Sequence, residues 1–397
     1  MADSKQILAD RIIFDECFKQ HALPNMLTAD APTMINAYDG KKQTPPTAPV
    51  VMINDLSKEH GNQVYSTIIH DLNEKPSMGI GKREGYEEDV TTANFPVKID
   101  QYHKSVKVSL MMEQQKVGYN RKKLGRPLLT RYHGQLLDEI CVYHACGARG
   151  TYDGDDRLIP VASDSDFSEI MVNPVTAPTY ERKFYAGAAT GISSGTAITT
   201  GDTFDVASVR KFKQGIELMA NPPKPVSLAG EDHLYIGFIT PKMWTDYETA
   251  TDDFQTQISN AIKRTSGFQH PLFKGEMFVK DDILFKKYTK PVGWQTGEAV
   301  KVCANDDAAT EADETVPAGV TVERGFILGG QALAIAYGNV LPGGKGNFKM
   351  DGELFDMNAW WRQWMDWIMG MAKVRFANAF GKINDYGVIA FDAHVAS

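Results

Sequence analysis

Apolar residues recur every three or four positions along one stretch of the chain, residues 116–149. This spacing places them on one side of a helix, and it predicts a long, mostly buried α-helix over the stretch. Gly125 and Pro127 interrupt the pattern, so we expect a bend or a fresh first turn near Pro127. Asp138 and Glu139 fall on the opposite, polar side. The rest of the fold is expected to be organised around this helix.

Two runs of alternating apolar and polar residues precede the helix, at residues 63–72 and 95–110. They predict a long two-stranded excursion. The segment between them, residues 73–94, is rich in glycine and charge and cannot form a core of its own, so we expect it to become ordered against another chain. The expected contact residues are Lys75, Lys82, Arg83, Glu84, Tyr86, Glu87 and Glu88.

The first 60 residues begin with a short amphipathic segment and continue as a strip with few apolar residues. Pro45, Pro46 and Pro49 favour an extended backbone there. Because such a strip cannot close an independent core, we expect an arm that gains its order by lying on another surface.

The second half of the chain alternates apolar runs with turn-forming residues, which predicts a mixture of strands and helices. Strands are expected at residues 233–240, within 270–290, at 323–328, 371–376 and 386–393. Helices are expected at residues 205–220 (capped by Asp202 or Thr203), 241–249 (starting at Thr240-Pro241), 253–264, after Gly330, and around 360–368 (capped by Asp356 or Asn358). The acidic residues 305–315 are expected to form an exposed loop.

Four tryptophans in the last of these helices can bury a large apolar area. Their counterpart is the apolar stripe of the long helix, which includes Leu136 and Ile140. We therefore expect Trp360, Trp364 and Trp367 to pack with that stripe in one core, although the two elements lie far apart in sequence.

The composition is that of a globular protein, with 43% hydrophobic and 23% charged residues among 397. This length predicts two or three structural units. A net charge of −8 argues against a protein whose main partner is duplex nucleic acid, because such proteins are usually basic. Residues 98–131 are locally basic, which indicates either a solvated face or a contact with acidic neighbours or nucleic acid.

No stretch approaches the ~18 consecutive apolar residues of a membrane span, and the first residues lack the pattern of a secretory signal. We therefore expect a protein that folds in a cytoplasm without a membrane partner. The four cysteines show no paired spacing, so reduced thiols are expected.

Patterns that would support metal or cofactor binding are weak. His133, Cys141 and His144 share one face of the long helix, but further ligands at metal-site spacing are lacking, so packing is the expected role. Residues 343–349 do not have the residue order of a phosphate-binding loop. We predict no catalytic, cofactor-binding or metal-binding residue.

Five sequence blocks together resemble a known family: ERKFYAGAAT, HLYIGFITPKMWTDYET, GFQHPLFKGEMFVKDDILFKK, VERGFILGGQALAIAYG and GMAKVRF…YGVIAFDA. Their order and spacing, from about residue 60 to the C-terminus, resemble the major capsid proteins of N4-like tailed phages. That family is similar in fold to the Hong Kong 97-type shell protein. The resemblance implies an α+β Hong Kong 97-like fold and a self-assembling structural protein, not an enzyme, in an icosahedral DNA-containing head.

The resemblance also implies a division of the chain into four parts. These are an N-terminal arm at 1–60, an extended loop at 61–110, a peripheral domain with a spine helix at 111–204 and 347–397, and an axial domain at 205–346. The thin arm and the charged excursion fit a closed shell, in which neighbouring subunits supply the missing half of each interface.

The partners implied by the resemblance are further copies of the chain, as pentamers and hexamers in the shell. A separate scaffold, a portal and decoration proteins are also implied, together with non-specific contact to packaged double-stranded DNA. The expected location is the virion, and the host cytoplasm before assembly. The sequence departs from some relatives in having no long helical N-terminal extension that would serve as a built-in scaffold.

Two alternatives remain open at this stage. The first is an intracellular α/β enzyme built around the strand at 233–240, for which Asp246, His270 and Lys280 would be the residues to mutate first. The second is another phage structural component, such as a tail or minor shell protein. An enzyme of this size would form a small oligomer, whereas a capsid subunit would form shells or rings of five or six copies.

Overall fold

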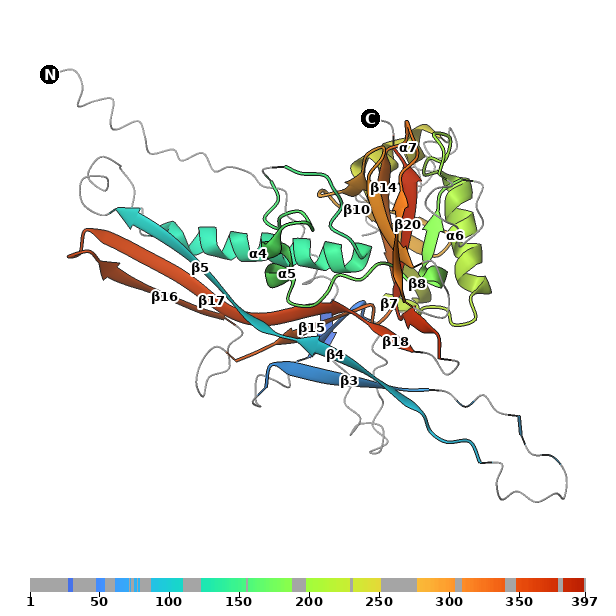
Figure 1. The fold of residues 1–397 in the computed structure, drawn as a ribbon, viewed down its shortest axis with the longest axis horizontal. Helices are drawn as coiled ribbons and strands as arrows, with labels where there is room; N and C mark the ends of the chain where they lie inside the picture. The colour runs from blue at the N-terminus through green and yellow to red at the C-terminus, as the bar shows by residue number, and fades with distance from the viewer. Residues whose placement is uncertain are drawn as a thin grey trace, which may run out of the picture.

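A computed structural model gives the fold of the chain. The residues that it describes are 28–30, 48–53, 61–70, 72, 75–76, 78, 87–109, 123–154, 156–187, 198–228, 231–250, 277–303, 309–339, 348–377 and 381–395. Within these residues the protein is a mixed α+β fold of two large β-sheets, small two-stranded sheets and helices that cover the large sheets (Figure 1).

The first large sheet is centred on one unusually long strand, β17. The sheet comprises β1 (Thr28–Asp30), β2 (Val50–Ile53), β5 (Asp100–Ser109), β15 (Leu333–Tyr337), β16 (Phe348–Phe355) and β17 (Trp360–Lys373). The strand β17 pairs antiparallel with β5, β16 and β15, and β2 joins the sheet parallel to β15. In Figure 1, β5, β16 and β17 run together and project well beyond the second sheet.

The second large sheet has the strand order β6-β20-β14-β8-β10-β9, with β11 paired to β14 and β7 paired to β8. Its strands are β6 (Lys183–Tyr185), β7 (Val226–Leu228), β8 (Glu231–Ile239), β9 (Met277–Lys280), β10 (Ile283–Lys287), β11 (Val292–Trp294), β14 (Val322–Leu328) and β20 (Val388–His394). Every residue of β14 is buried, because the strand has neighbours on both sides and packed elements on both faces.

Helices cover both faces of the second sheet. The described helices are α4 (Gly125–Cys146), α5 (Ser165–Met171), the 3₁₀ turn η4 (Tyr180–Arg182), α6 (Val206–Leu218) and α7 (Pro241–Thr249), and α4, α6 and α7 provide this cover. Residues of α6 and α7 form one apolar cluster with one face of the sheet, including Phe212 and Trp244. The last turns of α4 lie against the other face.

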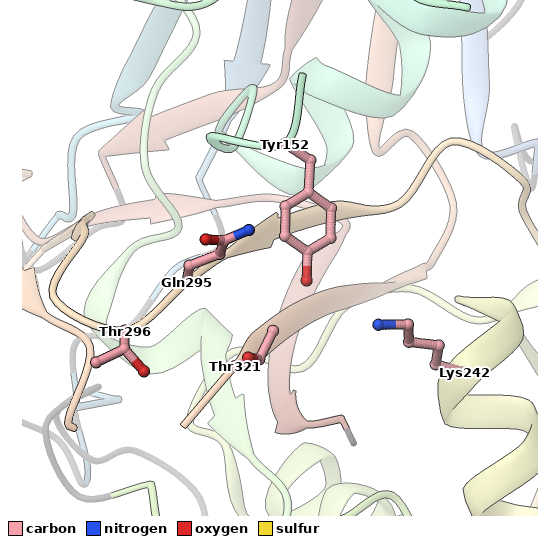
Figure 2. Close-up of a pocket in the computed structure, with 5 residues that line it drawn as sticks. All are labelled: Tyr152, Lys242, Gln295, Thr296 and Thr321. Atoms are coloured by element: carbon pink, nitrogen blue, oxygen red, sulfur yellow. The ribbon is translucent and has the colours of Figure 1, made fainter. Parts of the chain in front are cut away.

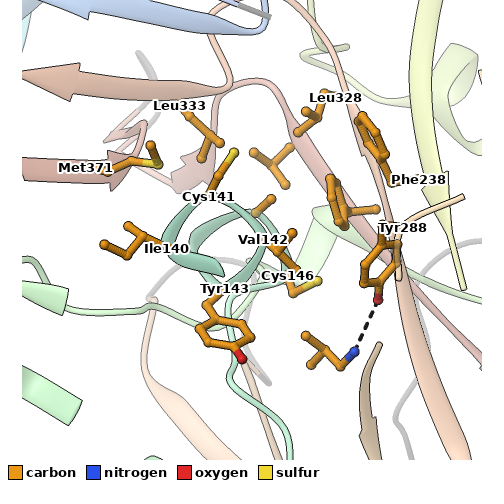
Figure 3. Packing of buried hydrophobic residues seen from close by; sticks show 14 of the residues in the cluster. Ile140, Cys141, Val142, Tyr143, Cys146, Phe238, Tyr288, Leu328, Leu333 and Met371 are labelled. Atoms are coloured by element: carbon orange, nitrogen blue, oxygen red, sulfur yellow. Dashed lines mark hydrogen bonds between the residues drawn. The ribbon is translucent and has the colours of Figure 1, made fainter. Parts of the chain in front are cut away.

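The helix α4 packs against both large sheets and so joins them into one core. Its residues Ile140 and Tyr143 share a buried cluster with Phe238 of the second sheet and with Leu333 and Met371 of the first (Figure 3). The stripe of apolar residues that predicts the helix is therefore the stripe that the two sheets cover.

Two glycines define the ends of α4. A side chain at Gly125 would meet Oε1 of Gln363 at 2.6 Å, so the first turn lies directly on β17. At the other end Gly147 has φ +67°, and a side chain there would meet the carbonyl oxygen of Thr176 at 2.5 Å. Glycine adopts this left-handed conformation without a steric penalty, and it ends the helix. The predicted helix therefore begins at Gly125 and ends at Cys146 in the described residues; residues 110–122 lie outside them.

Three two-stranded sheets complete the described fold. They are β3 (Gln63–Ile69) with β4 (Thr92–Lys98), β12 (Ala299–Cys303) with β13 (Glu311–Thr315), and β18 (Arg375–Ala377) with β19 (Ile383–Asp385). The β3–β4 pair projects away from both large sheets (Figure 1). The structure thus confirms the predicted excursion, and its return strand continues as β5 along β17.

Several predicted elements are confirmed in place. The strand at 233–240 is β8, and the helix that follows it is α7, where the Thr240 hydroxyl accepts a hydrogen bond from the Met243 N–H at 3.2 Å. The helix predicted at 205–220 is α6, but Asp205 caps it instead of Asp202 or Thr203, because the Asp205 side chain accepts from the Ser208 N–H. The helix predicted at 253–264 lies outside the described residues.

The prediction of a helix around residues 360–368 is wrong, because these residues form β17. Asp356, Met357 and Asn358 cap no helix; they have φ between 51° and 69° and form the turn that joins β16 to β17. Alternate residues of β17 face α4 and the opposite side, and tryptophans lie on both sides. The expected alternation of apolar and polar residues is therefore absent, and the tryptophan spacing imitates a helix.

Two smaller predictions also fail. The residues after Gly330 form the strand β15 instead of a helix, because they fill a gap between β17 and β2. Of the predicted acidic loop, residues 311–315 form β13, although most of that strand is exposed as expected. Alanine and acidic residues are disfavoured in strands, so pairing with the neighbouring strands overrides the local preference here.

Strand pairing crosses the expected division of the chain at several places, including the pairing of β5, from the expected extended loop, with β17. β15, expected with the axial part, pairs with β17. β20, expected with the peripheral part, pairs with β14 in the second sheet. Part of the expected arm, β2, is built into the first sheet, where Val50 and Ile53 are buried.

Candidate assembly surface

The β3–β4 ribbon carries large apolar side chains that the described chain leaves exposed. Tyr65 on β3 is 66% exposed, and Val90 just before β4 is 70% exposed. Leu72 and Met78, which belong to the connecting segment, are 67% and 88% exposed. Because isolated two-stranded ribbons are marginally stable and exposed apolar groups favour contact, this ribbon is suited to pack against another chain.

The base of the ribbon is fixed to the rest of the protein. Val97 is fully buried beneath the first sheet. The side chain of Asn173 bonds both backbone groups of Lys98, accepting from its N–H at 2.9 Å and donating to its carbonyl oxygen at 2.8 Å. The Ile99 N–H also donates to the carbonyl oxygen of Asn62 at 3.0 Å. The ribbon is thus held at its base, where Phe95 also packs edge-on against Phe376 at 5.8 Å, and its other face, which carries Tyr65, is open.

The predicted contact residues of this excursion are only partly described. Lys75 and Glu87 are exposed, and Glu88 is half-buried. Lys82, Arg83, Glu84 and Tyr86 lie outside the described residues. The exposed apolar residues of the ribbon were missed as contact candidates, although their alternation with polar residues in the sequence could have indicated them.

A second exposed apolar region lies along β16 and its turn. Phe348 and Leu354 are about half exposed, and Met357 in the turn is 98% exposed. The ion pair between Arg362 and Glu353 crosses the two strands nearby, and both side chains are about half exposed. The tip of this hairpin is therefore a second surface available to a neighbouring molecule.

The residues predicted to pack together lie on two sides of β17. Leu136, Ile140 and Trp367 are buried in one cluster, and the Trp367 ring contacts the His133 ring edge-on at 5.0 Å. Trp360 and Trp364 are half-buried. They belong to the side away from α4, where the Lys107 ammonium lies 3.9 Å from the Trp360 ring centre and Arg362 lies 6.0 Å from that of Trp364.

Buried ion pairs connect segments that are distant in sequence. Arg324 of β14 donates two hydrogen bonds to Asp392 of β20, at 2.6 and 2.9 Å, and a third to the carbonyl oxygen of Cys146 at 3.1 Å. The third bond places a cation at the C-terminus of α4, where the helix dipole favours it. Lys183 lies 3.5 Å from the same carboxylate.

The electrostatics of this first ion cluster follow from burial and pairing. Burial alone would raise the pKa of Asp392, but Arg324 and Lys183 lower it below its usual value. Burial lowers the pKa of Lys183 to about 8 against the opposing effect of Asp392. The cluster is fully desolvated, so each charge depends on its partner.

A second ion cluster closes the C-terminal segment. Asp385 accepts from Lys373 and from Arg375, each at 2.8 Å, and Arg182 donates to the Asp385 backbone carbonyl at 2.9 Å. Burial would raise the pKa of Asp385, but Lys373 and Arg375 lower it below its usual value. The acids and bases of both clusters stand inside apolar strand sequences, and this is the signal that sequence reasoning overlooked.

Glu139 differs from its predicted exposed position. It is 1% exposed and accepts hydrogen bonds from the backbone N–H groups of Leu158 and Ile159 at about 3.0 Å. Lys290 contributes an ion pair at 2.5 Å. The predicted polar side of α4 is therefore covered around Glu139 by the 157–160 segment, whereas Arg126 near the start of the helix is exposed.

The described residues include no group of three or more His, Cys, Asp or Glu side chains arranged to hold a metal ion. Cys141 and His144 are buried, and burial lowers the pKa of His144 to about 3, so its imidazole is neutral. Of the residues considered for an enzyme, Asp246 lies on α7 and Lys280 ends β9, whereas His270 is outside the described residues. Among the described helices, none is long and apolar enough to cross a membrane.

One cavity of about 420 Å³ opens beside α7 (Figure 2). It is lined by polar side chains from four segments: Tyr152, Lys242, Gln295, Thr296 and Thr321. The Tyr152 ring lies over Gly293, where any side chain would meet the ring at 2.6 Å. A second hollow of about 630 Å³ follows the basic first turns of α4, and includes Lys123, Arg126 and Arg131.

Comparison with solved structures shows which fold this is. The chain matches the capsid of Ralstonia phage GP4 with 22% identity and a TM-score of 0.73, covering 98% of this chain and 94% of that chain. It matches the capsid asymmetric unit of cyanophage Pam1 with 17% identity and a TM-score of 0.68, covering all of both chains. The capsid of Helicobacter pylori bacteriophage KHP30 matches with 13% identity and a TM-score of 0.60, over 97% of this chain and 94% of that chain.

At these identities the three structures establish a shared mixed α+β fold of phage capsids. A comparison with curated protein sequences gave no match. The sequence profile of the family described as "Phage capsid protein" matches residues 5–397. A profile match over nearly the whole length, joined to the fold and to the exposed ribbon, leads to one conclusion: the chain belongs to the phage capsid protein family and is a major capsid protein, a structural component of the virion.

Proposed function

We propose that this protein is a Hong Kong 97-like subunit that assembles into the icosahedral head of an N4-like tailed phage and encloses its double-stranded DNA. Pentamers and hexamers of the chain would form the closed shell. The single observation that carries this proposal is the β3–β4 ribbon, which is fixed at its base and exposes Tyr65 and Val90 along its length. In a shell, a neighbouring copy supplies the surface that such a ribbon lacks.

The proposed division of labour follows the four expected parts with two adjustments. The arm (1–60) and extended loop (61–110) would reach neighbouring subunits, the peripheral part would include α4 and β17, and the axial part would surround the capsomer axis. We assign β15 to the peripheral part and β20 to the axial part, because each pairs within that part's sheet. Many weak contacts of this kind add through multivalency to a stable shell.

Further partners are proposed from the same assembly. A separate scaffold, a portal and decoration proteins would act with this chain, which would assemble in the host cytoplasm. Contact with the packaged DNA would be non-specific, since the chain carries a net charge of −8 and its basic residues gather at sites such as the first turns of α4.

A shortened ribbon tests the proposal. Replacing residues 71–90 by Asn-Gly would close β3 and β4 with a tight turn, because His70 and Thr91 are already paired at 3.1 Å. We expect a folded protein with an unchanged unfolding curve that no longer forms closed shells under electron microscopy.

The matched control keeps the length of the loop and replaces residues 71–90 by a Gly/Ser linker. We expect this variant also to fail in closure, because the linker lacks the contact side chains. Normal shells from the shortened variant would refute the role of the ribbon. Normal shells from the linker variant alone would restrict that role to chain length.

A further inference from the structure

A buried carboxylate lies beside Lys242, one of the residues that line the polar cavity of Figure 2. Glu323, at the start of β14, is two residues from the lining residue Thr321, and its side chain is 1% exposed. The hydroxyl groups of Thr240 and Tyr152 lie beside this carboxylate as hydrogen-bonding groups, although neither of its oxygens has a hydrogen bond of good geometry within the described part of the chain. The ammonium of Lys242 lies 3.9 Å from Oε1, and its side chain is 47% exposed. A buried carboxylate whose nearest described cation is a half-exposed ammonium at the limit of ion-pair distance is costly, so its charge is only partly compensated.

The surrounding groups do not remove this deficit. Burial raises the pKa of Glu323, and Asp246 adds to the rise, whereas Thr240, Lys242 and Tyr152 act in the opposite direction. Asp246 itself has a buried oxygen without a hydrogen bond, and burial raises its pKa. The buried Glu323 and the half-buried Asp246 therefore share one half-exposed ammonium.

The remaining titratable groups of this region have other contacts. His394, which faces Asp246, interacts through Nδ1 with the backbone of Thr321. The charge of Glu298 raises the pKa of Tyr152. Glu298 itself accepts hydrogen bonds from the Thr151 hydroxyl and from the Gln295 N–H. The cavity therefore adjoins a net negative charge.

We propose that this cavity binds a cationic N–H donor, a guanidinium or primary ammonium group, which displaces Lys242 and pairs with Glu323. In the shell the group is an arginine or lysine side chain of a second copy of this chain, and this part rests on the shell assembly proposed above. The cavity would then be a socket that one subunit offers to another.

The lining of the cavity fits such a group. Tyr152 and Thr321 provide hydroxyl oxygens and Gln295 an amide oxygen, all of which accept hydrogen bonds from N–H donors. The Thr296 hydroxyl donates to the Val320 carbonyl at 2.9 Å, so its oxygen remains an acceptor. The volume of about 420 Å³ lies near the lower end of the range for small-ligand pockets, about 300–1,000 Å³, and suits one side-chain head group.

If the ligand displaces Lys242, then removing Lys242 should strengthen ligand binding. A purely structural role of Lys242 would not have this effect. Ligand-observed NMR would measure the binding of methylguanidinium to unassembled full-length subunits. We expect saturable binding that Glu323→Gln weakens about tenfold or more, because a hydrogen bond to a charged partner is lost. Lys242→Ala should strengthen binding about two- to fivefold, because a competing exposed ion pair is removed.

The control is Glu217→Gln on α6, an exposed acid paired with Lys213, which should bind methylguanidinium as the unchanged protein does. Acetate serves as the opposite probe. A cavity for anions would bind acetate and lose it in Lys242→Ala, and this result would overturn the proposal. Absence of saturable methylguanidinium binding, or equal binding by Glu323→Gln, would overturn it as well.

Assembled shells distinguish the source of the cation. If a second copy fills the socket, closed shells should bind methylguanidinium at least tenfold more weakly than subunits do. Equal binding by shells and subunits would overturn the second-copy part and leave a free cation as the ligand. Shell formation is scored separately by electron microscopy, so that a failure to assemble, which would count against the proposed function, is not mistaken for a failure to bind.

Discussion

Two antiparallel strand pairs of equal length have opposite surroundings in this protein. β14 and β20 pair over seven residues each, and so do β3 and β4. Every residue of β14 is buried, with α4 on one face and the cluster of α6 and α7 on the other. The β3–β4 pair packs on one face only, where Val64, Phe95 and Val97 join a small cluster, and exposes the face that carries Tyr65.

The comparison indicates where the chain is complete and where it is not. The β14–β20 pair finds all its packing partners inside one subunit, so substitutions there should act on folding. The β3–β4 pair leaves Tyr65 exposed, so substitutions there should act on assembly and leave folding unchanged. Four predictions test this contrast, from the largest expected effect on stability to the smallest.

The largest effect is expected from Asp392→Asn. It would leave Arg324 and Lys183 buried without their carboxylate, and breaking a buried ion pair in this way costs about 3–5 kcal/mol. Urea denaturation would measure the free energy of unfolding. The matched control is Glu353→Gln, which breaks an exposed ion pair with Arg362 and should cost less than about 1 kcal/mol. Equal costs for the two variants would contradict the difference between buried and exposed regions.

Trp367→Ala should be nearly as damaging, at about 3–5 kcal/mol, because it empties a site that is 2% exposed between β17 and α4. Trp364→Ala, on the other side of the same strand, removes a half-buried ring and should cost about half as much. Thermal unfolding of both variants would check the order. A larger loss of stability in Trp364→Ala than in Trp367→Ala would contradict this order and would show that the side of β17 away from α4 contributes more to the core.

Low pH should destabilise the folded protein through the two buried ion clusters. The pKa values of Asp385 and Asp392 are lower in the folded protein than in the unfolded chain. Their contribution is therefore complete above the unfolded-state pKa and is lost as the pH falls through the folded-state values, below about pH 4. Urea denaturation at a series of pH values should show this loss. The free energy of unfolding of Asp392→Asn should depend less steeply on pH than that of the unchanged protein. An unchanged pH dependence of stability in Asp392→Asn would contradict the contribution assigned to Asp392.

The smallest effect on stability is expected from Tyr65→Asp on the ribbon. The free energy of unfolding should change by less than about 0.5 kcal/mol, because the side chain is 66% exposed, while shell formation should fall sharply. Leu218→Asp on α6, where the leucine is 76% exposed, is the matched control and should assemble normally. The contrast fails if both variants assemble equally well or equally badly.

Sequence reasoning was accurate where local preference and burial agree. The stripe around Leu136 and Ile140 predicts α4, and Thr240 before Pro241 predicts the start of α7, because helix period and capping are local properties. Around Trp364 the same reasoning failed, because tryptophans lie on both sides of the strand and the sequence shows no simple alternation of apolar and polar residues. Of the assembly surface, the sequence indicated the excursion but not its exposed apolar side chains.

The sequence by itself determined the helices with clear period and caps, the long excursion and, through the resemblance of five blocks, the capsid family. Only the tertiary structure decided that residues 360–373 form a strand, that Glu139 is buried, and that Arg324 meets Asp392. The physical reason is the range of the interactions. Helix period and capping act within a few residues, whereas strand pairing and buried polar contacts depend on partners that can lie more than 200 positions away, such as Arg182 and Asp385, which are 203 positions apart.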